Sequence, residues 1–334
     1  MHVLYLTFGI LLFVFTALDI IKTTFSSNGG GLLTNMVSKA VWKTFFFSAG
    51  KNGRSKVLEY AGPAVLMMVL LAWVTGLWSG LFLMLLSDAD SVIKSTTKAS
   101  TGALEKLYYA GYTLSTLGVG DYVASTNFWR VVTNVAAYSG LVFITASITY
   151  FVPVLSAVGL QSRLSLYISG MGTTPQQILA NSWNGKDFSS FFDTTSDLCQ
   201  MLIQHTMNHH SYPVIHYFHN SKPRLAIAPA IVLLDETYQL LENYVAEDAK
   251  EDMLKMSMLR STLNAYLDMV QGRFLKQAEA NATAPSPGLH QLTEAGIPLQ
   301  EARGNKSQEL KERRKMLTVL LEKDGWGWAE VYPS

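Results

Sequence analysis

Cysteine and charge are both scarce in this sequence. Cys199 is the only cysteine, so neither an intrachain disulfide nor a Cys-x-x-Cys metal or redox pair can form. Charged residues make up 15% of the 334 residues and hydrophobic ones 49%, which is too apolar for an ordinary soluble protein of this size. The formal net charge of +1 gives no basic face of the kind that nucleic acids require. We therefore expect membrane segments and no nucleic-acid partner.

Three apolar runs predict membrane-spanning helices. Residues 3–21, 63–86 and 128–160 are each long enough, at about 1.5 Å per residue, to cross or nearly cross the hydrocarbon layer. Between the first two runs lie six Lys and Arg residues and one Glu, so the positive-inside rule places this loop inside. Three crossings then put the N-terminus outside and the C-terminal half in the cytoplasm of a multi-pass cell-membrane protein. Within the loop, residues 32–47 fit a helix lying in the membrane surface, in contact with lipids.

A short polar stretch, "TLSTLGVGDY" at residues 113–122, lies between the second and third runs. The loop is too short to form an outer domain, and we expect it to enter the membrane and return. Non-helical backbone at that depth needs protein or water to satisfy its polar groups, and cations in a pore can serve carbonyl groups in the same way. Gly118 and Gly120 then allow alternating backbone conformations that direct successive carbonyls to one side. Thr116 adds a hydroxyl at the inner end.

The motif from Thr116 to Asp121, after a short helix with Tyr108, Tyr109 and Thr113, resembles the tetrameric potassium channels, which have one pore loop between an outer and an inner helix. The resemblance covers roughly residues 63–160 and implies a non-enzymatic homotetramer with potassium ions in its filter. It implies that the ion-binding residues are Thr116, Leu117, Gly118, Val119 and Gly120. It implies that the filter is supported by Tyr108, Thr113, Ser115 and Asp121. It further implies a hinge or gate on the inner helix formed by Gly140, Ile144, Ile148, Val152, Pro153 and Ser156.

Two residues depart from the family pattern and leave alternatives open. Val119 stands where an aromatic residue is common, so a nonselective cation channel is an alternative to a potassium-selective one. Tyr108 stands where a Trp often bonds the filter aspartate, and its phenol can donate to Asp121. Gly140 serves either as a bend or as a close helix contact. Pro153 lacks a backbone donor and is expected to kink the inner helix.

The C-terminal half has helical patterns at residues 187–206, 223–245, 256–274 and 308–323, which predict a helical bundle. Residues 278–306 are rich in Ala, Pro and Gly and predict a flexible linker. The basic cluster at residues 311–315 is read as a solvated face or a contact with an anionic membrane surface. The expected fold is therefore an all-α membrane protein with three transmembrane helices, a re-entrant pore helix and filter, and a cytoplasmic helical domain. The predicted segments are 1–22 (first helix), 23–61 (inner loop), 62–160 (pore domain), 161–277 (helical domain), 278–306 (linker) and 307–334 (last helix and tail).

Five of the seven histidines lie within residues 205–219. His205 and His209 are four residues apart and share a helix face, and His216 with His219 would complete a zinc-type set after a turn. The alternative is that these residues are polar aromatic groups at a domain or subunit surface. A divalent metal, a pH-sensing role and an unknown cytoplasmic ligand all stay open here. A membrane sensor or scaffold that works through this cluster is the rival to a channel, whereas no His-Glu-x-x-His motif supports a tethered hydrolase.

Overall fold

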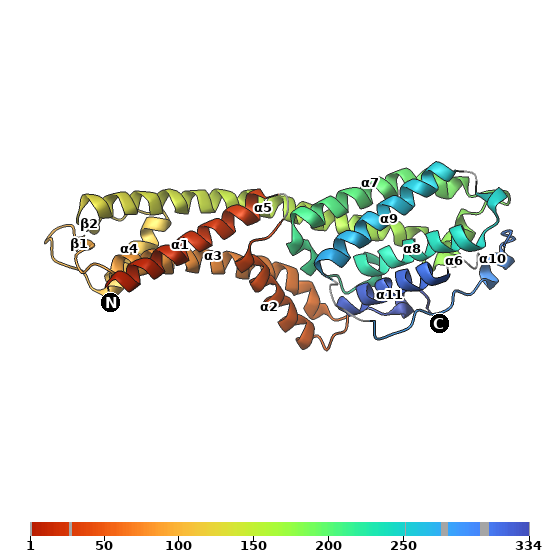
Figure 1. The fold of residues 1–334 in the computed structure, drawn as a ribbon, viewed down its shortest axis with the longest axis horizontal. Coiled ribbons are helices and arrows are strands. Elements are labelled where there is room, and N and C mark those ends of the chain that lie inside the picture. Colours follow the sequence, from red (N-terminus) through yellow and green to blue (C-terminus); the bar gives the residue numbers. More distant parts are fainter. Residues whose placement is uncertain (1, 27–28, 251, 275–279, 301–306, 334) are drawn as a thin grey trace. The chain divides into compact units, whose positions relative to one another are not determined.

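The computed structural model describes residues 2–26, 29–250, 252–274, 280–300 and 307–333. The chain divides into two compact units (Figure 1). The membrane unit contains Met1–Trp42, Pro63–Leu155 and Ser211–Val214. The C-terminal unit contains Lys43–Gly62, Ser156–His210 and Ile215–Ser334. Each unit is described by itself below.

Among the described residues, three helices are long and apolar enough to cross a membrane, as the sequence predicts. They are α1 (His2–Phe25), α3 (Ala61–Leu86) and α5 (Asn127–Met171). Helix α5 continues across Pro153 and past the predicted end of the pore domain. Helix α2 (Leu32–Ser48) confirms the helix expected in the loop between the first two spans. The fold is that of an all-α membrane protein, and its strands are only three residues long.

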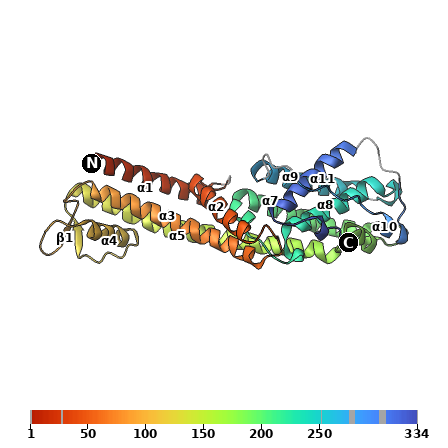
Figure 2. The same ribbon diagram turned by 90° about the horizontal axis from the view of Figure 1, so that it is seen from below.

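Glycines bring α1 and α3 into backbone contact, and the two helices lie side by side in both views (Figures 1 and 2). A Cβ atom added to Gly9 would lie 2.8 Å from the carbonyl oxygen of Gly80, and one added to Gly80 would lie 2.8 Å from the backbone nitrogen of Phe13. In the same way, a Cβ atom added to Gly76 would lie 2.4 Å from the hydroxyl oxygen of Thr16. Small residues at i and i+4 allow this close approach in membranes, where the hydrophobic effect does not drive helices together.

A buried carboxylate joins α1, α2 and α3. Asp19 of α1 is 4% exposed. Its oxygens accept hydrogen bonds from the backbone nitrogen of Leu33 at 2.8 Å, from the hydroxyl of Thr34 at 2.6 Å and from the indole nitrogen of Trp73 at 2.9 Å. Gly31 leaves room for it, since a Cβ there would lie 1.9 Å from a carboxylate oxygen. Asp19 therefore satisfies N–H groups in the first turn of α2, where a helix has unpaired donors and favours negative charge.

The segment between α3 and α5 contains a short helix and a two-stranded sheet. Helix α4 spans Ala103–Leu114 and is the pore helix of the sequence prediction. Strands β1 (Val92–Lys94) and β2 (Tyr122–Ala124) pair antiparallel, with Ile93 opposite Val123. The residues between α4 and β2 have neither helix nor strand structure, and they contain the Gly-x-Gly motif.

The C-terminal unit is a helical bundle around a shared apolar core, as predicted. Helix α8 (Ile227–Tyr244) is buried on most sides, which is typical of a helix at the centre of a bundle. The other helices of the unit are α6 (Pro175–Ser182), α7 (Ser189–Ser211), α9 (Met253–Arg273), α10 (His290–Glu294) and α11 (Ser307–Lys323).

The predicted flexible linker is wrong for its described part, residues 280–300. Leu292 in α10 is fully buried in the apolar core, and Ile297 is 4% exposed. The amide of Gln176 donates to the carbonyl of Gly288 at 2.9 Å, and Leu299 forms a β-bridge with Val245. Apolar residues spaced among Ala, Pro and Gly anchor this stretch to the bundle, and composition alone does not show this.

The prediction for the basic cluster on α11 is also corrected, because two of its residues form buried ion pairs. Arg313 forms a bidentate ion pair with Asp235 of α8, which is fully buried, and its third nitrogen donates to Asn264. Arg314 forms a second bidentate pair with Glu236, at 2.8 and 2.9 Å. These two arginines attach α11 to α8 and do not belong to a solvated face or a membrane-binding patch, whereas Lys311 and Lys315 of the same cluster are exposed.

Candidate functional site

The backbone after α4 alternates in handedness from one residue to the next. Thr116, Gly118 and Gly120 have φ angles of +58°, +59° and +86°, whereas Leu117 and Val119 between them do not have positive φ. Such alternation turns successive peptide carbonyls toward the same side. A Cβ on Gly118 or Gly120 would have nothing within 4 Å, so the backbone angle and not the available space calls for glycine there. Thr116 is β-branched and costs about 1–3 kcal/mol in this conformation, a strain typical of functional sites.

The carbonyl groups of this stretch are unpaired. No hydrogen bond between described residues ends on a carbonyl oxygen of Thr116–Gly120. The described residues from Ser115 to Asp121 are all exposed in the single chain, and the side chains of Leu117 and Val119 are 68% and 51% exposed. Backbone carbonyls that protein groups leave unpaired at membrane depth need another positively polarised partner.

Tyr109, which the sequence places on the predicted pore helix, holds α4 in place together with Tyr112 and Lys106, which the sequence does not single out. The hydroxyl of Tyr112 donates to the carbonyl of Tyr122 at 2.6 Å, which ties α4 to β2. The hydroxyls of Tyr109 and Thr133 are 2.8 Å apart and join α4 to α5. The buried ammonium of Lys106 donates to three carbonyls at and beyond the end of α3, those of Leu85, Asp88 and Ala89. The sequence feature that could have indicated these hydrogen bonds is a lysine on a helix face whose other residues are mostly apolar or aromatic.

The residues predicted to support the filter each make different contacts in the structure. Tyr108 packs edge-on against the rings of Tyr112 and Tyr122, and no hydrogen bond among the described residues joins it to Asp121. Asp121 instead accepts from the amide of Tyr122 at 3.1 Å. Tyr112 therefore bonds to β2 through its hydroxyl, whereas Tyr108 contacts β2 through ring packing with Tyr122. The predicted supports Thr113 and Ser115 lie at the end of α4, where the backbone nitrogen of Ser115 donates to Gly111 and the carbonyl of Thr113 accepts from Thr116.

Gly140 of α5 lies against the last residue of α4. A Cβ atom added to it would lie 1.8 Å from the carbonyl oxygen of Leu114, two residues before Thr116. Helix α5 and the end of α4 are thus in backbone contact, and this favours the close-packing reading of Gly140. Its role as a hinge stays a prediction.

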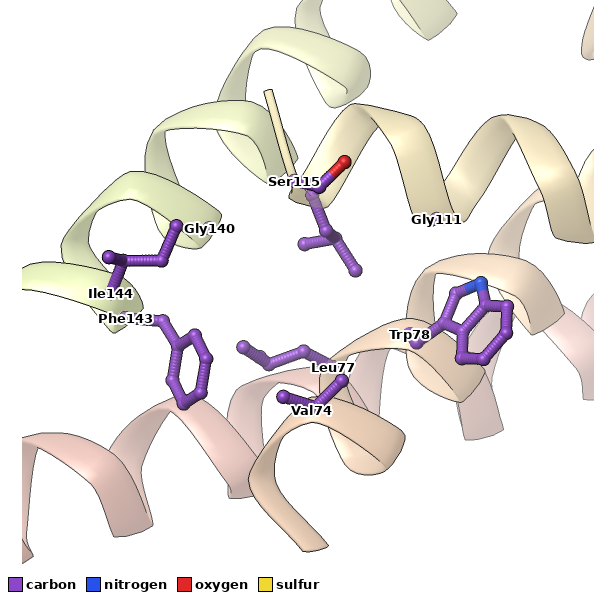
Figure 3. A pocket seen from close by; sticks show the side chains of 9 residues that line it. Val74, Leu77, Trp78, Gly111, Ser115, Gly140, Phe143 and Ile144 are labelled. Carbon is purple, nitrogen blue, oxygen red and sulfur yellow. The ribbon is translucent and has the colours of Figure 1, made fainter. Parts of the chain in front are cut away.

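An apolar cavity of about 330 Å³ lies between α3, the end of α4 and α5 (Figure 3). Figure 3 shows Leu77 and Trp78 of α3 on one side and Phe143 and Ile144 of α5 on the other, with Ser115 at the end of α4. The predicted gate residues Ile144, Ile148 and Val152 are 44%, 61% and 63% exposed and follow one another at four-residue spacing, so they share a face of α5. That this face lines a pore stays a prediction.

The histidine cluster of the C-terminal unit is a stack of rings. His205 and His209 are stacked at 5.7 Å between ring centroids, and His216 stacks on Phe274 at 3.9 Å. The fourth member of the predicted zinc set, His219, stacks on Trp326 instead. The described residues contain no group of three or more His, Cys, Asp or Glu side chains placed to hold a metal. The predicted metal site therefore gains no support from the geometry.

Burial makes His205 sensitive to acid. Its ring is 1% exposed, neither ring nitrogen has a hydrogen-bond partner among the described residues, and burial lowers its pKa from 6.5 to about 4. The folded state thus binds this proton less well than the unfolded state, and its stability falls as the pH drops from 6.5 toward 4. His205→Phe keeps a stacked ring without the nitrogens. We expect it to stabilise the protein by about 2 kcal/mol near pH 5 and by much less near pH 8, measured by thermal unfolding in mild detergent.

A matched variant with the opposite pH dependence is Asp324→Asn. Burial raises the pKa of Asp324 from 3.8 to about 7, so the stability of the folded state falls as the pH rises from 3.8 toward 7. We therefore expect Asp324→Asn to stabilise the folded protein near pH 8 and not near pH 4. Equal effects of the two substitutions at both pH values would contradict the assigned burial of the two groups.

Comparison with known proteins bears on the membrane unit. Residues 67–157 match a family model described as "Ion channel". The whole chain is 29% identical over 327 residues to an uncharacterized membrane protein, YdjJ, of Bacillus subtilis (strain 168), covering 97% of this chain and 95% of that protein. No solved structure matches the chain.

Proposed function

From the premise that residues 67–157 form an ion channel domain, we propose that the chain is a potassium-selective channel whose filter is the backbone of residues 116–120. The observation that carries the proposal is the alternating handedness at Thr116, Gly118 and Gly120, together with carbonyls that no described residue pairs. A cation that sheds its water shell needs such a set of carbonyl oxygens.

One chain supplies one loop, and one loop cannot surround an ion. We propose a homotetramer with closed rotational symmetry, in which four copies of residues 116–120 line one axis. The exposure of Leu117 and Val119 in the single chain supports assembly, because large apolar side chains beside a filter need a packing partner. The membrane is the cell membrane, with the N-terminus outside and the C-terminal unit in the cytoplasm, as the loop charges indicate.

A nonselective cation pore is the second candidate, and two side chains near the proposed filter support it. Val119 provides no ring and no hydroxyl to brace the filter, and Tyr108 does not bond Asp121 in the described structure. A filter with fewer side-chain braces holds its carbonyls less firmly, and selectivity depends on how the carbonyls are arranged.

Ion flux in a purified system separates these candidates. The full chain is purified in mild detergent, its oligomer mass is measured, and it is reconstituted in bilayers with potassium and sodium on opposite sides. We expect a tetramer and a reversal potential near the potassium equilibrium value. A reversal potential near zero would favour the nonselective pore. A monomeric or dimeric protein, or no cation current, would overturn the channel proposal and leave the sensor or scaffold reading.

A further inference from the structure

The loop between α2 and α3 (residues 49–60) is held by residues more than 160 positions away in the chain. The backbone nitrogen of Gly53 donates to the carbonyl of Gly325 at 2.8 Å, and the Gly53 carbonyl lies 2.7 Å from the Nε2 atom of His219. The ring of Trp326 stacks on His219 with centroids 5.4 Å apart. Gly53 thus contacts three residues of the C-terminal unit, and the loop itself belongs to that unit.

Both glycines at this contact are required by its geometry. A Cβ on Gly53 would lie 2.7 Å from the Trp326 ring, and one on Gly325 would lie 2.7 Å from the backbone nitrogen of Gly53. Gly325 also has a φ of +77°, which side chains rarely adopt. Two backbones therefore meet with no side chain between them, so the contact is specific to these two segments.

Charged groups extend the contact on either side. The guanidinium of Arg54 forms a bidentate pair with Glu330, at 3.0 Å from Nε to Oε1 and 2.9 Å from Nη2 to Oε2. The carboxylate of Glu59 accepts hydrogen bonds from the amide and the hydroxyl of Ser221. Glu59 is followed directly by Tyr60 and then by the first residue of α3, Ala61. The pairs thus hold the chain immediately before the outer helix begins.

From this contact we infer that the C-terminal segment, residues 324–332, regulates the proposed channel by holding the α2–α3 loop. The inference rests on the proposed function. By its connectivity the C-terminal unit acts on the inner helix, since α5 runs into it without a break. The held loop gives it a second attachment, to the start of the outer helix.

The held loop is suited to opening and closing. The polar contacts of the loop are partly exposed, with the side chain of Arg54 64% accessible, whereas Leu58 in the same loop and the Trp326 ring against Gly53 are buried. Local opening draws on regions with few buried apolar contacts and solvent-exposed hydrogen bonds. The ion pair and hydrogen bonds of residues 53–54 can therefore open while Leu58 and the bundle stay in place, and their release loosens the chain that leads into α3.

Charge reversal tests the inference with an internal rescue. Arg54→Glu and Glu330→Arg each replace attraction by repulsion, and the double variant restores the pair with its signs exchanged. We expect the backbone amides of residues 49–60 to exchange hydrogen severalfold faster in each single variant and at the wild-type rate in the double variant. Potassium flux in proteoliposomes should change in the single variants and recover in the double variant. The reversal potential should stay constant in all of them, because the filter is untouched.

Lys311→Glu on the exposed side of α11 makes the same change in charge away from the loop and should alter neither measurement. Unchanged hydrogen exchange in both single variants would overturn the contact. Faster exchange with unchanged flux would overturn the regulatory role. Absence of flux from the wild-type protein would overturn the proposed function and the regulation that rests on it, while the exchange measurement would still decide whether the loop is held.

Discussion

Gly140→Ala is expected to reduce potassium flux about tenfold or more and to alter selectivity, because overpacking of a tight contact costs about 1–3 kcal/mol and 1.4 kcal/mol corresponds to a factor of ten. The added Cβ would lie 1.8 Å from the carbonyl oxygen of Leu114, so α4 or α5 must shift. Leu114 is followed by Ser115 and Thr116, and a shift of α4 therefore reaches the first carbonyl of the proposed filter. Reversal potentials and flux in reconstituted bilayers measure the two effects.

The matched control is Gly159→Ala, on the same helix. A Cβ there has nothing within 4 Å, so the substitution should leave flux and selectivity near the wild-type values. The pair also separates the two readings of Gly140. A hinge glycine replaced by alanine changes how often the pore opens and leaves the reversal potential unchanged. Wild-type selectivity with altered opening in Gly140→Ala would therefore favour the hinge over the packing contact.

We expect Asp19→Ala to remove most of the yield of folded protein. The substitution leaves the backbone nitrogens of Leu33 and Thr34 and the indole nitrogen of Trp73 without their acceptor, in a site that is 4% exposed. Each buried donor left unpaired costs about 1–3 kcal/mol, and the sum is comparable with the whole stability of many proteins. The yield of monodisperse protein in mild detergent and its resistance to heating report the loss.

Asp19→Asn and Asp193→Ala complete this series. The amide of the first keeps one acceptor oxygen but places a donor against donors, so it should lie between wild type and Asp19→Ala. Asp193 has a side chain that is 81% exposed and a lysine partner at 4.0 Å, and its removal should cost little. Equal yields from Asp19→Ala and Asp193→Ala would contradict the role given to the buried carboxylate.

The features that could be predicted from the sequence are those that depend on residues close together along the chain. Long apolar runs predicted α1, α3 and α5, and the spacing of Gly118 and Gly120 predicted a backbone that needs positive φ. Helical periodicity likewise predicted α7, α8, α9 and α11 of the bundle, but not the short helices α6 and α10. Each of these depends on local geometry and on the identity of neighbours within a few residues.

What the sequence could not predict depends on pairs of residues far apart along the chain. Arg313 and Asp235 are 78 positions apart, and neither residue type indicates that the other will be buried beside it. Asp19 stands near the end of an apolar run, and nothing in the neighbouring sequence shows that it caps a helix that begins with Leu32. Lys106 likewise serves carbonyls of the preceding helix. Only the folded arrangement brings these donors and acceptors together.

The C-terminal unit is discontinuous in the sequence, and this affects how its gene can be divided. A recombinant fragment beginning at Ser156 would lack Lys43–Gly62, which belong to the same compact unit. Its Trp326 ring would lose the backbone that covers it, and Phe218 would lose its contact with Gly62, where a Cβ would lie 2.5 Å from the ring. Chimaeras that exchange this unit with a relative must therefore transfer both stretches together, or the recombined halves will present mismatched surfaces.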